Sequence, residues 1–284
     1  MDLREIIEPF EWEALADRVA APLPQRWLYG DAAKRVGREA RRLCLFDGAG
    51  PVALAQVVSR PMFGCRTSLI LRGPLILAEC DRKAVVAQLR RALPRGLKLM
   101  SPEDRLGKLR LSAPPEMVEL DLSRTQEDLR AGMGAKWRNA LKKAERAQMK
   151  TARLQPSPRG LMPLLQAEKT RQDAGHYRGV PPELTLAIQE VAPQSLRLFQ
   201  AADAQMLFVV HGNTATYQIG HTGPEGRRWN AHNLILWQAM RELKAEGVIR
   251  LDLGTLDRDK APGLARFKLR SGAKPRYLAP AALM

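Results

Sequence analysis

Two consecutive arginines, Arg227 and Arg228, lie in the segment 223–230, which also holds two glycines and a proline. Residues 231–246 then read as a helix that ends at Gly247. The first N–H groups of a helix have no partner within it, and the helix dipole adds positive potential there. This order of residues predicts a site for an anion such as a phosphate. The alternative is two solvated arginines at the tip of a loop.

The neighbouring segments are expected to place this helix at the end of two parallel strands. Residues 206–210 and 214–219 are apolar, β-branched or aromatic runs separated by Gly-Asn, the pattern of a β-hairpin. Residues 248–253 are nearly all apolar, as in a strand buried on both faces. A strand, a helix and a second strand in this order form a right-handed crossover, so the two flanking strands should be parallel.

Polar side chains on these strands are candidates for the same site. Asp252 lies at the end of the second strand, where it could take a proton from an attacking amine or orient that amine. A structural carboxylate paired with an arginine is the alternative. Tyr217 and Gln218 lie on the first strand and are candidates to bind substrate. Their alternative roles are packing in the core or on the sheet surface.

Other catalytic signatures are missing from the sequence. It contains no G-x-S-x-G motif, no Walker loop, no G-x-G-x-x-G after a strand and no H-E-x-x-H. The four histidines are too scattered to predict a metal site: His176, His211, His221 and His232. Transfer of an activated acyl group directly to an amine needs no protein nucleophile, and we expect it here without a metal or a tightly bound cofactor.

The chain of 284 residues carries a net charge of +16, which attracts phosphates, nucleic acids and anionic lipids. Residues 1–120 hold 20 basic and 15 acidic side chains, whereas residues 121–284 hold 26 and 15, so the excess lies mainly in the second half. A helix expected over residues 125–149 has one apolar and one basic face. The basic face is a candidate contact for RNA or a membrane surface, with simple solvation as the alternative.

The sequence favours a cytoplasmic location. Cys44, Cys65 and Cys80 are far apart, which indicates neither a disulfide framework nor a zinc ribbon. The N-terminus is acidic and amphipathic, unlike a signal peptide. No apolar stretch approaches the roughly 20 residues of a membrane span, so we expect at most a peripheral membrane contact.

Both halves show the same order of elements: helices, an antiparallel meander, a helix and a strand. This order predicts an α/β (α+β) chain of two domains, each with a mixed, mostly antiparallel sheet flanked by helices. For the first half we expect helices over 3–20, 29–41 and 84–93, with strands over 43–46, 52–58, 67–71 and 97–100. For the second half we expect further helices over 158–172 and 183–191, with strands over 117–122 and 196–201.

Several motifs resemble the FemAB-like acyltransferases of the GNAT superfamily. In the second half they are KWRNALKKAE at 136–145, HNLILWQAM at 232–240, GVIRLDLG at 247–254 and GLARFKLRSG at 263–272. In the first half, QRWLYG at 25–30 and RGP at 72–74 resemble the N-terminal half of that family. The resemblance covers most of the chain. It implies two GNAT-like domains, 1–115 and 116–284, that face a shared cleft, with the donor site in the second.

The resemblance also implies roles for individual residues. Lys268 matches the lysine of the family's Phe-Lys pair and would stabilise an oxyanion or a phosphate, while Arg266 would contact substrate; the alternative is one basic run over 266–276. The pyrophosphate loop of GNAT enzymes reads Q/R-x-x-G-x-G/A. When residues 227–232 are matched to this pattern, Asn230 stands at its fourth position, where glycine is expected. The residues implied to bind the donor are Arg227, Arg228, Asn230, Ala231 and His232, although His232 could instead cap or pack the helix.

The expected function is a transferase that moves an acyl group to an amine. The charge and the altered loop favour aminoacyl-tRNA as the donor. The simple scaffold, which lacks the long helical arm of the peptidoglycan-bridge enzymes, favours acyl-CoA. A small molecule, a peptide or a lipid would carry the acceptor amine. The rival hypothesis is a non-catalytic RNA- or membrane-associated protein that retains the fold.

Overall fold

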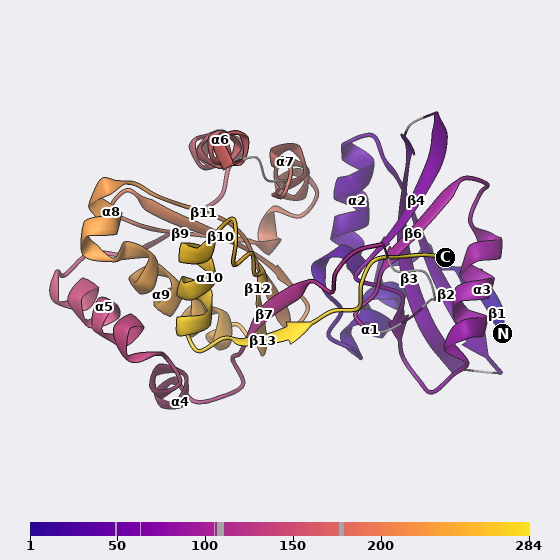
Figure 1. Cartoon of the computed structure of the whole chain (residues 1–284), viewed down its shortest axis with the longest axis horizontal. Helices are drawn as coiled ribbons and strands as arrows, with labels where there is room; N and C mark the ends of the chain where they lie inside the picture. The colour runs from indigo at the N-terminus through magenta and orange to yellow at the C-terminus, as the bar shows by residue number, and fades with distance from the viewer. Residues whose placement is uncertain (49, 63, 105, 107–110, 176–178) are drawn as a thin grey trace. The chain divides into compact units, whose positions relative to one another are not determined.

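The computed structural model describes residues 1–48, 50–62, 64–104, 106, 111–175 and 179–284, so His176 lies outside the described residues. The chain divides into two compact units, one of Met1–Pro115 with Tyr277–Met284 and one of Glu116–Arg276. Each unit has a mixed sheet flanked by helices, which confirms the α/β class (Figure 1). The end of the second domain was expected at residue 284. Instead, the last strand, β14 (Ala282–Leu283), pairs with β6 (Leu97–Ser101) of the first unit.

The sheet of the first unit has the strand order β1-β2-β3-β4-β6-β14, and β5 also pairs with β3. Helix α3 packs its buried Val85 and Leu89 against one face of this sheet, and α1 packs Trp12 against the other. The remaining elements of this unit are β1 (Asp2–Glu5), α1 (Pro9–Asp17), α2 (Trp27–Arg35), β2 (Glu39–Asp47), β3 (Gly50–Met62), β4 (Cys65–Leu71), β5 (Leu75–Ile76) and α3 (Arg82–Ala92), with a 3-10 turn at Leu23–Gln25.

A buried polar network locks the start of α2 onto this sheet. The Gln25 side chain donates to the carbonyl of Leu71, and Gln56 donates to the carbonyl of Arg26. The Arg42 guanidinium carbon lies over the Trp27 ring, 3.4 Å from its centre, and the Arg42 Nε donates to the Gln56 side chain. Gln25, Arg26 and Trp27 of the first-half motif therefore have partners within this unit, as buried polar groups require.

The sheet of the second unit has the strand order β13-β7-β12-β11-β10-β9-β8. Its N-terminal elements are β7 (Glu116–Asp121), α4 (Gln126–Ala131), α5 (Ala135–Arg146), β8 (Ala152–Leu154), α6 (Pro158–Gly175) and α7 (Pro182–Val191), followed by a 3-10 turn at Pro193–Ser195. Its C-terminal elements are β9 (Leu196–Ala201), β10 (Ala204–His211), β11 (Thr214–Thr222), α8 (Pro224–Trp229), α9 (Ala231–Ala245), β12 (Arg250–Thr255), α10 (Pro262–Arg270) and β13 (Lys274–Tyr277).

Helices cover both faces of the second sheet. Met206 and Phe208 of β10 join the core that α5 and α9 close, together with Ile235 and Leu236 of α9. Leu207 and Val209, on the opposite face of β10, are also buried, and α6 and α7 lie on that side (Figure 1). Burial of both faces explains why this strand reads as a continuous apolar run.

The central strands part near their carboxyl ends. Strands β11 and β12 are parallel, as expected, and their pairing joins Thr214–Thr216 to Arg250–Asp252. On the other side of β11, Leu207 pairs with Ile219 and Phe208 with Tyr217, so Gln218 is the extra residue of a β-bulge. A β-bulge bends its strand, and this one lies just beyond the paired residues, so the two strand ends are no longer paired. We call the region between these unpaired ends the gap between β11 and β12.

Four expected elements were wrong in extent or type. Residues 2–5 form strand β1 rather than part of a helix, because they pair with β2 at the sheet edge. The expected 29–41 helix ends at Arg35, after which Gly37 takes φ +73°. The expected 125–149 helix breaks into α4 and α5 at Gly132–Gly134. The expected loop 223–230 contains the short helix α8, whose Glu225 and Gly226 N–H groups bond to the carboxylate of Asp203.

Asn230 joins α8 to α9 in the left-handed conformation, with φ 58° and ψ 40°. Its carbonyl accepts the N–H of Asn233, which begins α9 immediately. Glycine tolerates this conformation best, and asparagine is among the few other residues that adopt it at low cost. The Asn230 departure from the family loop therefore preserves the backbone conformation for which glycine is commonly used.

We expect Asn230→Gly to change the free energy of unfolding by less than about 0.5 kcal/mol, and Asn230→Ala to lower it by about 1 kcal/mol. Urea denaturation measures both values. Ala202, which has φ 48°, supplies the control, because Ala202→Gly should stabilise the protein by relieving the same strain. Equal stability of Asn230→Ala and the wild type would contradict this account of the junction.

Candidate functional site

Lys268 lies buried at the gap between β11 and β12. Its side chain comes from α10, and only 6% of the residue is exposed. The Nζ atom donates to the carbonyl of Thr255 on β12 at 3.0 Å and lies 5.8 Å from the centre of the Tyr217 ring on β11. The lysine therefore connects the two strands where their pairing has ended.

Burial lowers the pKa of Lys268 to about 8, while the charge of Asp252 opposes this shift. The amino group is still mostly protonated at neutral pH, so it supplies a positive charge inside the protein. A buried ammonium beside a strand gap can stabilise negative charge that develops there more strongly than a solvated one.

Asp252 supports this arrangement from β12. It is 2% exposed, and its Oδ1 accepts the N–H of Gly254 at 2.7 Å. Gly254 takes φ +81°, and a Cβ atom built on it would lie 3.8 Å from the Lys268 Nζ. The Asp252–Gly254 turn therefore sets the path of the backbone toward the Thr255 carbonyl that Lys268 contacts.

Helix α10 is held in place at its C-terminus. The N–H of Gly134, which begins α5, donates to the carbonyl of Arg270 at 2.9 Å. Gly272 follows with φ +97°, and a Cβ atom there would lie 3.2 Å from the Gly132 carbonyl oxygen. The C-terminus of α10 thus packs against the break between α4 and α5. This contact holds α10 in place, and with it Lys268, which lies two residues before Arg270.

An aromatic group adjoins the lysine. The ring of Phe267 lies 5.9 Å from Trp137 of α5 and 6.2 Å from His232 of α9. The indole Nε1 of Trp137 is buried and has no hydrogen-bond partner among the described residues. In the sequence, Trp137 lies on the apolar face of the expected 125–149 helix, a position that gives no sign of an available donor.

His232 is positioned by β11 as well as by its own helix. Its Nε2 lies 2.8 Å from the carbonyl oxygen of His221, and burial lowers its pKa. A hydrogen bond to a carbonyl requires the proton on Nε2. The preceding residue, Ala231, is fully buried at the first position of α9. His232 therefore packs at the helix start as a neutral donor.

The two arginines before α9 lie on α8 and are exposed. The Arg227 guanidinium donates to the carbonyl of Thr222, and the Arg228 guanidinium lies 5.1 Å from the centre of the Trp229 ring. Lys143 of α5 donates to the carbonyl of Arg228. The structure therefore brings the basic face of α5 to the α8–α9 junction, an association that the sequence did not predict.

Two further candidates lie apart from Lys268. The Gln218 side chain donates to the Thr185 hydroxyl of α7 at 3.1 Å, which directs it toward the helices opposite α9. Arg266 is exposed on α10, and two residues along a helix correspond to slightly more than half a turn, so it points away from Lys268. The structure groups Tyr217, Asp252 and Lys268, with His232 nearby through Phe267.

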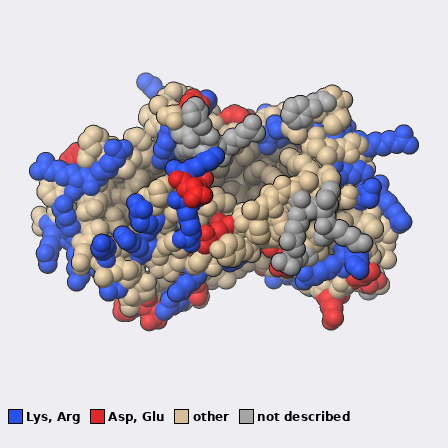
Figure 2. Space-filling model, in the orientation of Figure 1, with Lys and Arg blue, Asp and Glu red and all other residues tan. Residues whose placement is uncertain are grey.

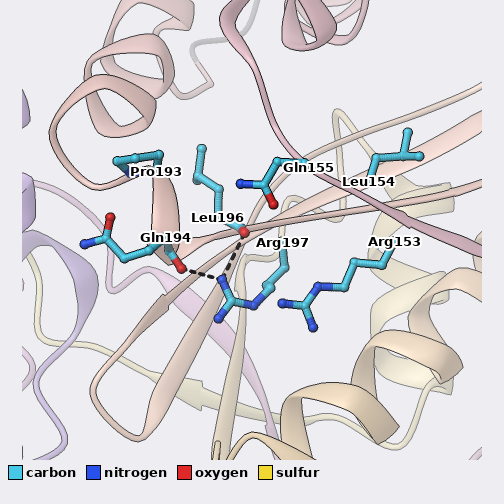
Figure 3. A pocket seen from close by; sticks show the side chains of 7 residues that line it. All are labelled: Arg153, Leu154, Gln155, Pro193, Gln194, Leu196 and Arg197. Carbon is cyan, nitrogen blue, oxygen red and sulfur yellow. Dashed lines mark hydrogen bonds between the residues drawn. The ribbon is translucent and has the colours of Figure 1, made fainter.

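A hollow of about 480 Å³ lies elsewhere on this unit, beside β8 and β9 (Figure 3). Arg197 uses its guanidinium to donate to the carbonyls of Gln194 and Leu196. Arg153 and Arg197 both form ion pairs with Glu246. These partners neutralise much of the positive charge in this hollow, and none of the predicted site residues lines it.

The described residues offer neither a metal-binding cluster nor a membrane-spanning helix. His, Cys, Asp and Glu side chains there form no group of three able to hold a metal ion. No helix in those parts of the chain combines the length and the apolar character needed to cross a bilayer.

Comparisons with known proteins agree with this architecture. Residues 135–269 match the family model of the acetyltransferase (GNAT) domain, a region that runs from α5 to α10 and contains every candidate site residue. A search of curated protein sequences found no match.

Solved structures extend the similarity to the whole chain. The crystal structure of FemX has a TM-score of 0.79 at 13% identity, over 99% of this chain and 96% of that one. The C-terminal domain of a putative lysylphosphatidylglycerol synthetase from Agrobacterium fabrum has a TM-score of 0.57 at 14% identity, over 97% and 92%. A tandem GNAT protein from the clavulanic acid biosynthesis pathway has a TM-score of 0.53 at 13% identity, over 99% and 98%.

At such low identity these neighbours show the fold, and the family model identifies the domain that holds Lys268. Residues 135–269 are thus similar to an acetyltransferase (GNAT) domain, and the whole chain is similar in fold to FemX.

Proposed function

We propose that this protein is an N-acyltransferase that moves an activated acyl group directly to an amine at the gap between β11 and β12. The observation that carries the proposal is the buried ammonium of Lys268 between Tyr217 and the Thr255 carbonyl, in a GNAT domain. A positive charge held in a protein interior is costly, and such groups are found where function requires them.

The amine nitrogen attacks the acyl carbonyl carbon, which forms the new C–N bond and places negative charge on the carbonyl oxygen. The Lys268 ammonium donates a hydrogen bond to that oxyanion. Collapse of the intermediate breaks the C–O bond of an ester or the C–S bond of a thioester. The leaving oxygen or sulfur gains a proton and the amine nitrogen loses one. Asp252 acts as a positioning residue, because it holds the Gly254 turn and keeps Lys268 charged.

The donor is an aminoacyl-tRNA in our preferred version and an acyl-CoA in the other. The charge of +16 and the exposed Arg227 and Arg228 support the RNA donor. The family model supports acyl-CoA as a donor that is not tightly bound. Names of structural neighbours mention a lysylated lipid and AcCoA. The acceptor is an amine on a small molecule, a peptide or a lipid.

A thermal-shift titration separates the two donors. With an aminoacyl-tRNA donor, tRNA should raise the melting temperature in a concentration-dependent way, and CoA at matched concentrations should not, because only a ligand of the native state stabilises it. A rise with CoA and none with tRNA would reverse the order of the two donors.

Lys268→Ala should reduce turnover by about 10²- to 10³-fold, the usual effect of removing one oxyanion donor. Because the ammonium is the active form, wild-type kcat/KM should fall as pH rises through about 8, the pKa of Lys268. Lys268→Arg keeps its charge above this pH, so its residual activity should not show that fall. Steady-state kinetics between pH 6 and 9.5 measure both effects.

Lys260→Ala is the matched control, because Lys260 is an exposed lysine on the loop before α10. Circular dichroism and melting temperature should show that every variant remains folded. Full activity of a folded Lys268→Ala protein would remove the proposed site. It would favour the rival hypothesis of a non-catalytic RNA- or membrane-associated protein, whose binding would depend strongly on salt.

Asp252→Asn tests the positioning role separately. An asparagine Oδ1 can still accept the Gly254 N–H, but the negative charge is lost, so the pKa of Lys268 should fall further. The high-pH loss of activity should then begin at a lower pH than in the wild type, with turnover at pH 6 largely retained. A uniform loss of activity at every pH would instead identify Asp252 as the proton acceptor.

A further inference from the structure

Trp229, the last residue of α8, is half-buried and has two cationic side chains over its ring. The Arg228 guanidinium carbon lies 5.1 Å from the ring centre, and the Lys143 Nζ lies 5.5 Å from it. The two cations come from different helices, since Lys143 belongs to α5. The π-electrons of the indole attract both cations, so the aromatic ring and the positive charge lie directly against each other.

The positive charge at this point is not neutralised by carboxylates. Lys143 and Arg227 donate to the carbonyl oxygens of Arg228 and Thr222. The described carboxylates form no ion pair with Lys143, Arg227 or Arg228, and α8 itself carries one acid, Glu225, in its first turn. By contrast, the arginines of the hollow beside β8 and β9 share Glu246.

The charge continues along α5. The exposed basic residues of this helix and the turn after it are Lys136, Lys142, Lys143, Arg146 and Lys150. Lys and Arg side chains gather on the visible surface over α5 and α8 (Figure 2). An aromatic ring on a cationic surface is the combination that binds a nucleobase by stacking and its phosphates by charge.

We propose that Trp229 is a stacking platform for a nucleobase, and that Arg228 and Lys143 bind the phosphate attached to the same nucleotide. This inference rests on the proposed function, since it assigns the site to the nucleotide end of the donor. The 3′ end of an RNA and the adenosine 3′-phosphate end of CoA share this chemistry.

The position of the platform suits such a role. Trp229 directly precedes Asn230, where the chain turns into α9. Three residues after Trp229, His232 packs 6.2 Å from Phe267, the neighbour of Lys268. A nucleotide held on α8 therefore binds beside the start of α9, and the acyl group that it carries can extend toward the gap between β11 and β12.

Fluorescence anisotropy tests the platform with a labelled single-stranded RNA that carries no acyl group and with an otherwise identical RNA whose sites are all abasic. Trp229→Ala should weaken binding of the base-containing RNA by about 10-fold or more, since stacking contributes substantially per base, and should leave the abasic RNA unchanged. Trp229→Phe should keep most of the affinity. Lys143→Ala should weaken the binding of both probes and reduce the slope of log Kd against log salt concentration by about 0.7.

Competition with CoA and with 4′-phosphopantetheine, which lacks the nucleoside, distinguishes the two sources. If CoA is the natural ligand, Trp229→Ala should weaken the binding of CoA about 10-fold and leave the binding of 4′-phosphopantetheine unchanged. If RNA is the natural ligand, the variant should weaken the binding of RNA alone. Arg90→Ala removes an exposed charge from α3 of the first unit and is the control for net charge. Melting temperatures verify that each variant is folded.

Unchanged affinity of Trp229→Ala for both base-containing ligands would overturn the platform, and so would an equal loss for the abasic probe. This outcome is separate from a failure of the proposed reaction, because the binding assay requires no acyl transfer. Folded Lys268→Ala that retains turnover would remove the transferase while leaving a base-dependent effect of Trp229→Ala intact.

Discussion

The short pairing of β11 with β12 is the constraint on which the candidate site depends. Their ladder ends at Thr216 and Asp252, and the bulge at Gln218 bends β11 beyond that point. Backbone groups at the strand ends then need other partners, because polar groups buried in a sheet must be satisfied. Lys268 bonds to the Thr255 carbonyl, and Asp252 accepts the Gly254 N–H. The same contacts that complete the sheet thus bring a positive charge into it.

This arrangement requires helices that are distant in sequence to meet. Helix α10 carries Lys268, and its C-terminus bonds to Gly134 at the start of α5. Helix α5 carries Trp137 on its buried side and Lys143 on its exposed side. One helix therefore supports the buried aromatic group near the lysine and the cationic surface near Trp229. A change in the α4–α5 junction would disturb both, since it holds α10 and orients α5.

Several site features could be predicted from residue patterns, and several could not. The parallel strands, the helix between them and the position of Asp252 followed from apolar runs and glycines. The hydrogen bond from Gln218 to α7 could not be predicted, because a bulge and a side-chain contact with another helix leave no pattern in the local sequence. The helix α8 was missed because its segment opens with Gly223-Pro224 and holds a second glycine, Gly226, which is typical of a loop. Its stabilising contact is the carboxylate of Asp203, over 20 residues earlier.

By itself, the sequence determined the class of fold, the crossover unit, the concentration of basic residues in the second half and the family resemblance at residues 136–145, 232–240, 247–254 and 263–272. These depend on periodicity, composition and short motifs, which are local. Only the tertiary structure decided that Lys268 is buried beside Tyr217 and Asp252, that Arg266 is not, and that Lys143 reaches Trp229. The physical reason is that burial and charge compensation come from helices packed across a sheet, and no single segment specifies its neighbours.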